Sequence, residues 1–246
     1  MKILVIGETC EDIFIYGEVK RFSPEAPVPV LNPTETVSNH GMSGNVVQNL
    51  KALNSDLEII HWYQIEPIKK TRFVEKKSNH MFLRFDEGEG NIEELKLNAD
   101  NIREIQNVDG VIVSDYNKGF LDEKVLVEIT KNSKFSIIDS KRKIGSNLVS
   151  CFDFIKLNEL EFMGCNLNSH HLKKILITLG SKGAKHMDKI YPSPDPKETI
   201  DVSGAGDTFT ASFTLKYLET KNLEESIIFA NKMASIVVSK RGVATP

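Results

Sequence analysis

The fold of this chain is decided by the stretch Asp201-Val202-Ser203-Gly204-Ala205-Gly206-Asp207-Thr208, which an apolar run follows directly. We expect a helix from about Ala205 to Leu218. The two glycines allow a tight turn and a close backbone approach, and the amides that open the helix remain unpaired. Those amides and the helix dipole favour an anion, such as a phosphoryl group in transfer. The pattern therefore predicts an anion site at the helix start, with Asp207 beside it.

A carboxylate in this position can accept a proton from a hydroxyl group that attacks phosphorus. The alternative is structural: Ser203 or Asp207 caps the helix, and the glycines serve only the turn. Short glycine motifs occur often by chance, so this pattern alone leaves both interpretations open.

Short apolar runs rich in β-branched residues alternate with amphipathic helical patterns along the chain. The runs are Ile3–Ile6, Val111–Val113, Ser136–Ile138, Phe154–Leu157 and Ile175–Thr178. Helical patterns lie between them, as at Asn101–Gln106 and Glu123–Lys131, and a last helix is expected from about Leu223 to Ser239. This order predicts an α/β fold with a mostly parallel sheet covered by helices.

A different pattern occupies two segments near the front, residues 13–36 and 70–86. Its runs alternate like strands with one face in solvent: Ile13–Tyr16, Val28–Leu31, Thr71–Lys76 and Met81–Phe85. We expect them to form a small antiparallel lid over the edge of the main sheet. The proline-rich stretch Pro192–Pro196 indicates a rigid loop between strong elements, so residues 1–246 are expected to form a single domain.

The composition excludes several classes of protein. Hydrophobic residues make up 40% of the 246 residues and charged residues 26%, which is ordinary for a globular protein. A net charge of −3 argues against a general nucleic-acid binder, although it leaves room for a local basic pocket that holds a phosphorylated small molecule. The three cysteines show no paired spacing, which argues against disulfides or zinc and favours a cytoplasmic setting. The first apolar run is too short for a signal peptide or a membrane span.

Further along the chain, several motifs resemble one enzyme family. The glycine-rich stretch is similar to the C-terminal signature of the ribokinase (PfkB) carbohydrate kinases, which is close to Asp-Thr-x-Gly-Ala-Gly-Asp. Within that family, four further motifs resemble the bacterial D-glycero-β-D-manno-heptose 7-phosphate kinases. They are Tyr16-Gly17, Arg21-Phe22-Ser23-Pro24-Glu25-Ala26-Pro27-Val28-Pro29-Val30, Ser114-Asp115-Tyr116-Asn117-Lys118-Gly119 and Phe229-Ala230-Asn231. The motifs run from Gly7 to Thr245 in the family's order.

The resemblance implies a ribokinase-like three-layer sandwich with a small β lid, and a kinase that uses ATP and Mg²⁺. The implied acceptor is a sugar phosphate, with D-glycero-β-D-manno-heptose 7-phosphate favoured. Alternatives are a kinase for another sugar or a nucleoside, or a trimmed homologue that binds a ligand without catalysis. The lid implies a homodimer through Ile13–Leu31 and Thr71–Phe85, and neither a nucleic acid nor a membrane is expected as a partner.

The resemblance also assigns roles to residues around the acceptor. Asp207 is the implied catalytic base, next to the anion-binding residues Gly204, Ala205 and Gly206. Asp12 matches a residue that accepts a sugar hydroxyl. The other implied substrate residues are Arg21, Gly41, Asn45, Lys70, Arg72 and Arg84. A planar arginine fork suits phosphate because it donates two parallel hydrogen bonds. The rival interpretation makes Asp12 a turn residue and the basic residues solvated strand charges.

A second group is implied to bind the nucleotide. Asn158 and Glu161 fit an Asn-x-x-Glu motif that orders magnesium and phosphate, with Glu161 reaching the metal through water. The remaining implied contacts are Thr178, Gly180 and Gly183 in a nucleotide loop, and Asn231 on a helix that borders the adenine. Asn158 and Glu161 could instead be a helix cap and a surface acid.

Each of three further motifs has both a functional and a structural interpretation. Ser114-Asp115-Tyr116 follows a strand and could be a site or only a turn. His170-His171 is more typical of a solvated pair than of a metal site. Lys141-Arg142-Lys143 indicates a solvated loop, although Asp139 and Lys141 also fit an Asp-x-Lys element of the relatives.

The chain also departs from the family pattern. Met42 stands where relatives usually carry the second glycine of the substrate loop, so the approach of the sugar is expected to differ. The stretches from Asn49 to Lys70 and from Glu161 to Ile175 are short, and the first is expected to lack a β-α unit. No nucleotidyltransferase domain follows Pro246, so we expect the kinase activity alone.

Overall fold

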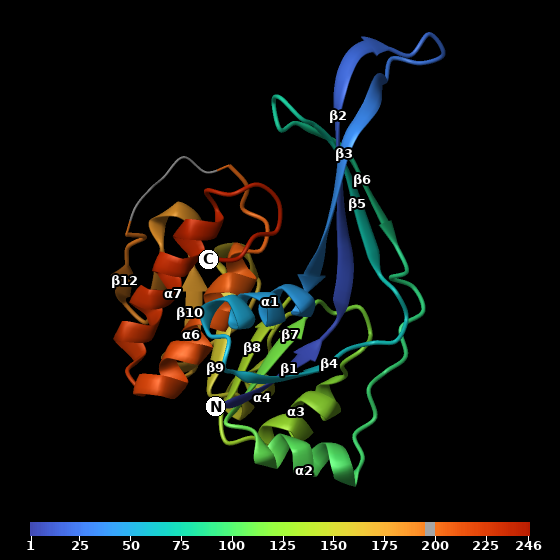
Figure 1. Ribbon diagram of the computed structural model, residues 1–246. Coiled ribbons are helices and arrows are strands. Elements are labelled where there is room, and N and C mark those ends of the chain that lie inside the picture. The colour runs from blue at the N-terminus through green and yellow to red at the C-terminus, as the bar shows by residue number, and fades with distance from the viewer. Residues whose placement is uncertain (195–199) are drawn as a thin grey trace.

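The computed structural model describes residues 1–194 and 200–246, and its largest element is an eight-stranded sheet (Figure 1). The strands in spatial order are β12 (Lys189–Tyr191), β11 (Ala184–His186), β10 (Ile175–Thr178), β9 (Phe154–Asn158), β8 (Ser136–Ser140), β7 (Gly110–Asp115), β1 (Lys2–Gly7) and β4 (Glu58–Trp62). The run from β10 to β4 is parallel, and β11 and β12 add antiparallel strands at one edge. All five apolar runs of the sequence lie in this sheet, which confirms the mostly parallel arrangement.

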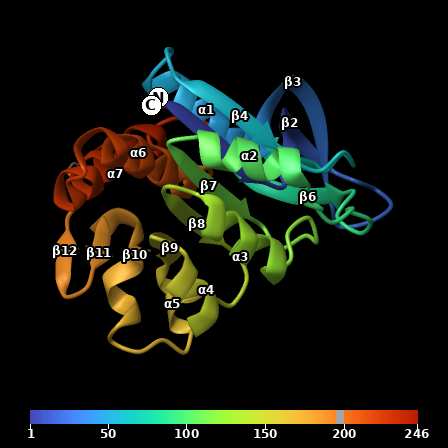
Figure 2. The same ribbon diagram turned by 90° about the horizontal axis from the view of Figure 1, so that it is seen from below.

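Helices cover both faces of the sheet and complete three layers. One face carries α1 (Ser43–Leu53), α6 (Ala205–Thr220) and α7 (Leu223–Val237), and the other carries α2 (Ala99–Asn107), α3 (Glu123–Asn132), α4 (Ser146–Cys151) and α5 (Glu159–Met163). Figure 2 shows α6 and α7 on one side of the strands and α4 and α5 on the other. Two short 3₁₀ turns, His171–Lys174 and Gly180–Lys182, flank β10. Apolar side chains of each helical layer pack on the sheet in a separate core cluster.

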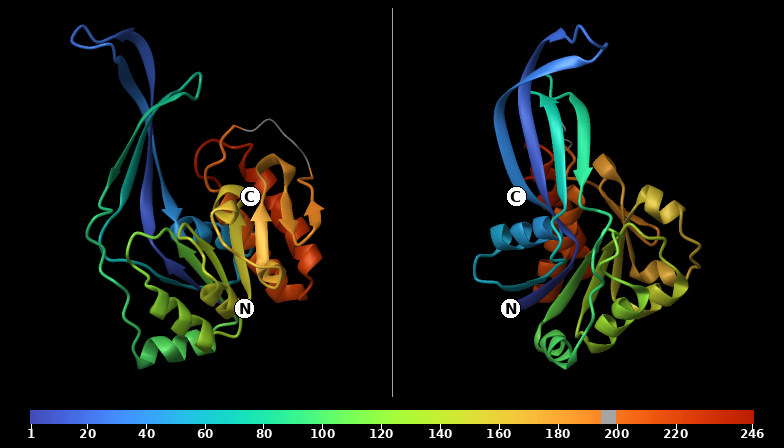
Figure 3. Two further views of the ribbon diagram at one scale, coloured as in Figure 1. Left: turned by 180° about the vertical axis from the view of Figure 1, so that it is seen from behind. Right: turned by 90° about the vertical axis from the view of Figure 1, so that its right-hand side faces the viewer.

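A second, four-stranded sheet stands on the body at the carboxyl ends of its parallel strands (Figure 3). Its order is β3 (Pro29–Met42), β2 (Thr9–Phe22), β5 (Lys69–Glu75) and β6 (Met81–Glu87). This sheet is the expected lid, but the expectation of a purely antiparallel lid is wrong because β2 and β5 pair in parallel. Between β3 and β5 the chain passes through α1 and β4, and this long connection supplies the crossover that a parallel pair requires.

The shortened stretch after α1 has a visible consequence. The chain leaves β4 and enters the lid strand β5 through residues 63–68, and no helix forms between these two strands. β4 is therefore the edge strand of the main sheet. Of the expected loop Pro192–Pro196, the last two residues, Asp195 and Pro196, lie outside the described residues. Across residues 1–194 and 200–246, no helix has both the length and the apolar character that a membrane crossing needs.

Replacement of Phe213 by alanine is expected to destabilise the body strongly. Phe213 is fully buried, and its ring lies 5.1 Å from that of Phe154 and 5.7 Å from that of Tyr217. Truncation of a buried aromatic side chain leaves a cavity and typically lowers the free energy of unfolding by about 3–5 kcal/mol. Urea denaturation of F213A measures this loss. The exposed Ile190 provides the control I190A, and a loss for F213A as small as that of the control would contradict this packing.

Candidate active site

A cavity of about 320 Å³ lies between the lid and the carboxyl ends of the parallel strands. Open α/β sheets bind ligands at this edge, because the loops that follow the strands meet there. The residues that line the cavity are Asp12, Gly41, Met42, Lys70, Arg72, Arg84, Tyr116, Lys118, Lys141, Ser203, Gly204, Asp207 and Val243. The cavity thus brings together lid residues, the glycine-rich turn and Asp207.

The glycine-rich turn sets the geometry at the start of α6. Gly204 is the N-cap and adopts a left-handed conformation, with φ at 80°, which glycine adopts without steric penalty. The amide of Ala205 donates to the Val202 carbonyl at 3.3 Å. Among the described residues, no acceptor is found for the amides of Gly206 and Asp207. These two amides leave the positive end of the helix dipole open to an anion.

A buried lysine lies directly under this turn. Lys156 lies on β9, and its ammonium group would be only 2.7 Å from a Cβ atom added at Gly206. The same ammonium donates to the Asp139 carboxylate at 2.8 Å, so this interior charge is paired. A side chain at position 206 would push this ammonium group out of its place beside Asp139, so glycine preserves the ion pair.

Asp207 is the carboxylate at the floor of the cavity, and it is held by two partners. The side-chain amide of Asn45 donates to Oδ2 at 2.9 Å, and the hydroxyl of Tyr116 donates to Oδ1 at 3.2 Å. Burial raises the pKa of Asp207 to about 6, and repulsion from Asp139 adds to this. The hydrogen bond from Asn45 and the charges of the nearby lysines act in the opposite direction. The result is a fixed carboxylate that is ionised at neutral pH and more basic than an exposed one.

The sequence leaves open whether Tyr116 belongs to the site or only to a turn. In the structure its hydroxyl donates to the Asp207 carboxylate, so it belongs to the site. The loop that carries it is fixed by Glu8, a fully buried residue that follows β1. The Glu8 carboxylate accepts from the amides of Tyr116 and Lys118, both at 2.9 Å, and from that of Phe120 at 3.3 Å. Three backbone donors satisfy the buried charge and lock the loop. Sequence reasoning missed Glu8, whose only signal is its place directly after a buried strand.

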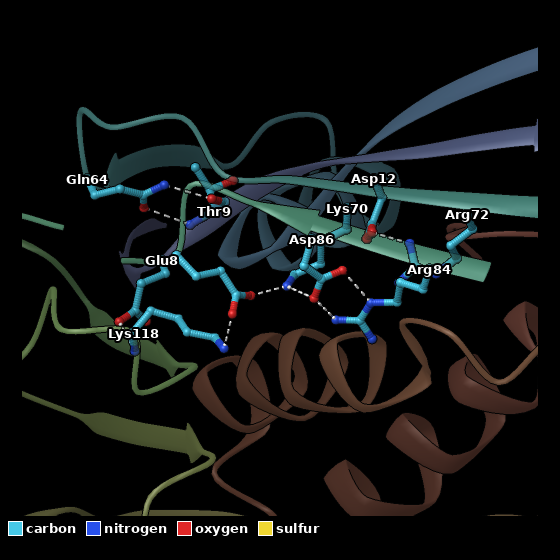
Figure 4. Close-up of polar contacts among 10 residues, drawn as sticks. Glu8, Thr9, Asp12, Gln64, Lys70, Arg72, Arg84, Asp86 and Lys118 are labelled. Atoms are coloured by element: carbon cyan, nitrogen blue, oxygen red, sulfur yellow. Dashed lines mark hydrogen bonds and ion pairs between the residues drawn. The ribbon is translucent and has the colours of Figure 1, made fainter. Parts of the chain in front are cut away.

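An arginine and an aspartate form an ion pair on the lid side of the cavity (Figure 4). Arg72 on β5 donates to the Asp12 carboxylate on β2, and both side chains are largely buried. A Cβ atom at Gly41 would lie 2.3 Å from Asp12 Oδ2, so the absence of a side chain on the adjacent strand makes room for this carboxylate. Asp12 is therefore an ion-pair partner placed in the cavity wall rather than a simple turn residue.

The other expected basic residues of the lid also carry acidic partners. Arg84 donates two hydrogen bonds to the Asp86 carboxylate, at 2.7 and 2.6 Å, and Lys70 donates to the same carboxylate at 3.2 Å. Lys70 also contacts Glu89, which accepts from Lys118 at 2.5 Å. These lysines and arginines are therefore not free solvated charges. They form a network around the cavity, in which the acids offset most of the positive charge.

Arg21 lies apart from this group. It is exposed near the end of β2, in the long β2–β3 hairpin, and it is not one of the described residues that line the cavity. The structure therefore does not bring Arg21 together with Lys70, Arg72 and Arg84.

Met42, at a position where glycine is expected, has a backbone conformation with positive φ that favours glycine. It is the N-cap of α1, with φ at 59° and ψ at −132°, and it lines the cavity. A side chain in such a conformation carries strain on the order of 1–3 kcal/mol. The Met42 side chain packs with Cys10 and Ile68 and forms part of the cavity wall.

Asn158 and Glu161 form the capping box of α5. The Asn158 side chain accepts from the Glu161 amide at 2.8 Å, and the Glu161 carboxylate accepts from the Asn158 amide at 2.7 Å. Glu161 also accepts from Lys141 at 2.5 Å. In the described part of the chain, no three His, Cys, Asp or Glu side chains gather as a metal cluster. A metal here would depend on single carboxylates and on oxygens brought by a ligand.

The expected nucleotide loop follows β10. Thr178 ends this strand and its hydroxyl donates weakly to Leu157, at 3.4 Å. Gly180 and Gly183 both have positive φ, and a Cβ atom at Gly183 would lie 2.2 Å from the Tyr191 carbonyl. Asn231 on α7 donates to that same carbonyl at 2.8 Å, so its side chain ties α7 to β12. The loop follows the carboxyl end of β10, and α7 packs beside α6 on one face of the sheet.

Removal of the Tyr116 hydroxyl is expected to raise the pKa of Asp207 further above 6. The hydroxyl donates to the carboxylate, and a donor stabilises the ionised form. Carboxyl ¹³C NMR titration of Y116F against the wild type measures the shift, and Y63F, an exposed tyrosine, is the control. An unchanged or lower pKa for Asp207 in Y116F would show that this hydrogen bond does not act on the base.

Comparisons with known proteins agree with this arrangement. The pfkB family carbohydrate kinase model matches residues 46–246. The bifunctional protein HldE of Helicobacter pylori (strain J99) is 35% identical over 302 residues, and that of a Nitratiruptor species is 31% identical over 290 residues. These matches cover 99% of this chain but only 64% and 63% of the two relatives. The aligned lengths exceed the 246 residues of the chain, in agreement with its shortened segments.

Solved structures support the fold. Ribokinase from Thermotoga maritima superposes with a TM-score of 0.74 at 19% identity, covering 98% of this chain and 94% of that one. Arabidopsis thaliana ribokinase complexed with ribose and ATP gives 0.73 at 17% identity, with coverages of 98% and 93%. The architecture is therefore ribokinase-like. With the family match over most of its length, the chain belongs to the pfkB family of carbohydrate kinases, ATP-dependent enzymes that transfer a phosphoryl group to a hydroxyl acceptor.

Proposed function

We propose that this protein phosphorylates a sugar phosphate, with D-glycero-β-D-manno-heptose 7-phosphate as the preferred acceptor. The observation that carries the proposal is the buried Asp207 carboxylate, next to open amides at the start of α6 and facing a cavity lined by lysines and arginines with acidic partners. The similarity to the HldE proteins and the heptose-kinase motifs of the sequence support the choice of acceptor.

The proposed reaction uses few protein groups. Asp207 accepts the proton of the acceptor hydroxyl while that oxygen forms a bond to the γ-phosphorus of ATP and the bond from phosphorus to the ADP oxygen breaks. The amides of Gly206 and Asp207 stabilise the charge on the transferring group, and Asp12 orients the sugar. A base with a pKa of about 6 is ionised at neutral pH and still accepts a proton readily.

For the nucleotide, we propose the loop with Thr178, Gly180 and Gly183, bordered by Asn231, and the Asn158–Glu161 turn. Magnesium fits this donor set because it usually keeps several waters and takes one or two carboxylates together with phosphate oxygens. When bound, it neutralises charge on the phosphates. Glu161 would reach it through water. The body and the lid segments 13–36 and 70–86 together form, in this proposal, one kinase domain over residues 1–246.

The proposal is tested by coupled assays with ATP and Mg²⁺ over heptose 7-phosphate, other sugar phosphates, free sugars and nucleosides. We expect turnover to require the acceptor's phosphate and to be fastest with heptose 7-phosphate. D207N keeps the side-chain shape but loses the base, so its rate should fall about 10²–10⁴-fold while ATP still binds. Equal rates with free sugars would exclude a phosphate pocket, and silence over the whole panel would favour a ligand-binding homologue. A fully active D207N would remove Asp207 from the mechanism.

We also propose a homodimer through the lid. β6 is an edge strand of the small sheet, and Leu83 and Phe85 are 56% and 52% exposed on the face opposite Arg84. An exposed edge with apolar side chains is suited to pairing with a second copy. Sedimentation velocity at micromolar concentration should give a dimer for the wild type and a monomer for L83K. A monomeric wild type under these conditions would contradict the proposal.

A further inference from the structure

One carboxylate connects the lid to the body. Glu89 follows β6 and lies between two glycines, Gly88 and Gly90. Its side chain contacts the ammonium group of Lys70 on the lid strand β5, and it accepts from Lys118, in the loop after β7, at 2.5 Å. In Figure 4 the side chain of Lys118 points toward Lys70, which lies next to Asp86 and Arg84. One carboxylate thus contacts an ammonium group of the lid and one of the body.

The two lysines face the cavity, whereas their shared partner does not. Lys70 and Lys118 both line the cavity, and Glu89 is not one of the described residues that do. The Glu89 carboxylate thus contacts the ammonium groups from outside the cavity lining. Each ammonium has three N–H donors; Lys118 uses one of them on Glu89, and Lys70 uses two on Glu89 and Asp86. Donors remain on both groups for an anion in the cavity.

The backbone of Lys118 and the side chain of Lys70 are fixed by other contacts as well. The Lys118 amide donates to the buried Glu8 at 2.9 Å, and Lys70 is 5% exposed within β5. Local charge favours a further anion, because the four cations Lys70, Arg72, Arg84 and Lys118 face three carboxylates, Asp12, Asp86 and Glu89. A phosphate group carries the charge and the acceptor oxygens that such a site would bind.

We propose that Glu89 is a positioning residue that holds Lys70 and Lys118 as an anion subsite across the boundary of lid and body. The subsite takes the phosphate of the acceptor substrate, and in this respect the inference rests on the proposed function. Lys118 thereby joins the lid residues as a determinant of substrate specificity, and closure of the lid onto the body becomes coupled to the presence of that phosphate.

A second role for Glu89 would change phosphate affinity in the opposite direction, so the two roles can be distinguished by experiment. If Glu89 competed with the phosphate for the two lysines, its neutralisation would strengthen phosphate binding. If Glu89 positions them, its neutralisation leaves the ammonium groups free to separate, and phosphate binding weakens. The location of Glu89 outside the cavity lining favours the second outcome.

The test uses the full chain and inorganic phosphate as the probe. Calorimetric titration at constant ionic strength should give about a tenfold higher Kd for E89Q than for the wild type. E87Q, which changes an exposed glutamate two residues away, is the matched control and should bind as the wild type does. Thermal melting of each variant checks that it is folded. Tighter binding by E89Q, or no phosphate binding by the wild type, would overturn the inference.

A double-mutant cycle adds a readout that a general structural defect would not reproduce. If Glu89 acts through the two lysines, E89Q should raise the Kd for phosphate by a smaller factor in the K118M background than in the wild type, because only Lys70 then remains to be positioned. In turnover assays, E89Q should raise KM for the phosphorylated acceptor and leave kcat and the KM for ATP nearly unchanged. Additive effects on Kd would overturn the inference. Phosphate binding with this pattern, but without turnover of any sugar phosphate, would refute the proposed function and leave the anion subsite standing.

Discussion

A buried carboxylate has to be hydrogen-bonded, and in this protein that constraint joins the elements of the site. Asp207 opens α6, Asn45 lies in the first turn of α1, and Tyr116 follows β7. An ionised group without such partners would be strongly disfavoured in the interior. The start of each helix and the end of the strand must therefore meet at one point, which fixes α1 and α6 over the carboxyl edge of the sheet. The body thus supplies open amides, a helix dipole and a desolvated base, whereas the lid supplies charged side chains whose fixed partners limit the freedom lost on binding.

Much of the fold could be predicted from local patterns. The five strand runs, the helices that begin near Ala205 and Leu223 and the lid strands follow from periodicity and turn residues, which act over a few positions. The direction of pairing between β2 and β5 could not be predicted locally, because it depends on the path of the chain through α1 and β4. The Asp201–Thr208 stretch marked the site for a similar reason: its turn, helix start and carboxylate are contiguous in sequence.

Residues that act across long sequence distances were harder to recognise. Tyr116 lies 91 positions from Asp207, and neither its spacing nor its residue type indicates that its hydroxyl reaches the carboxylate. Glu8 and Glu89 were also missed, since an acid after a strand or between glycines usually lies in solvent. In the opposite sense, the sequence grouped Arg21 with the other basic residues, and the length of the β2–β3 hairpin separates it from them.

The central claim is that the start of α6 holds the migrating phosphoryl group while Asp207 prepares the attacking oxygen. The most direct test is a crystal structure with ADP, aluminium fluoride, Mg²⁺ and heptose 7-phosphate. The account predicts the fluoride group on the amides of Gly206 and Asp207, and the acceptor hydroxyl about 2.6–3.2 Å from the Asp207 carboxylate. An acceptor hydroxyl directed to another group, or a fluoride group bound away from α6, would contradict it.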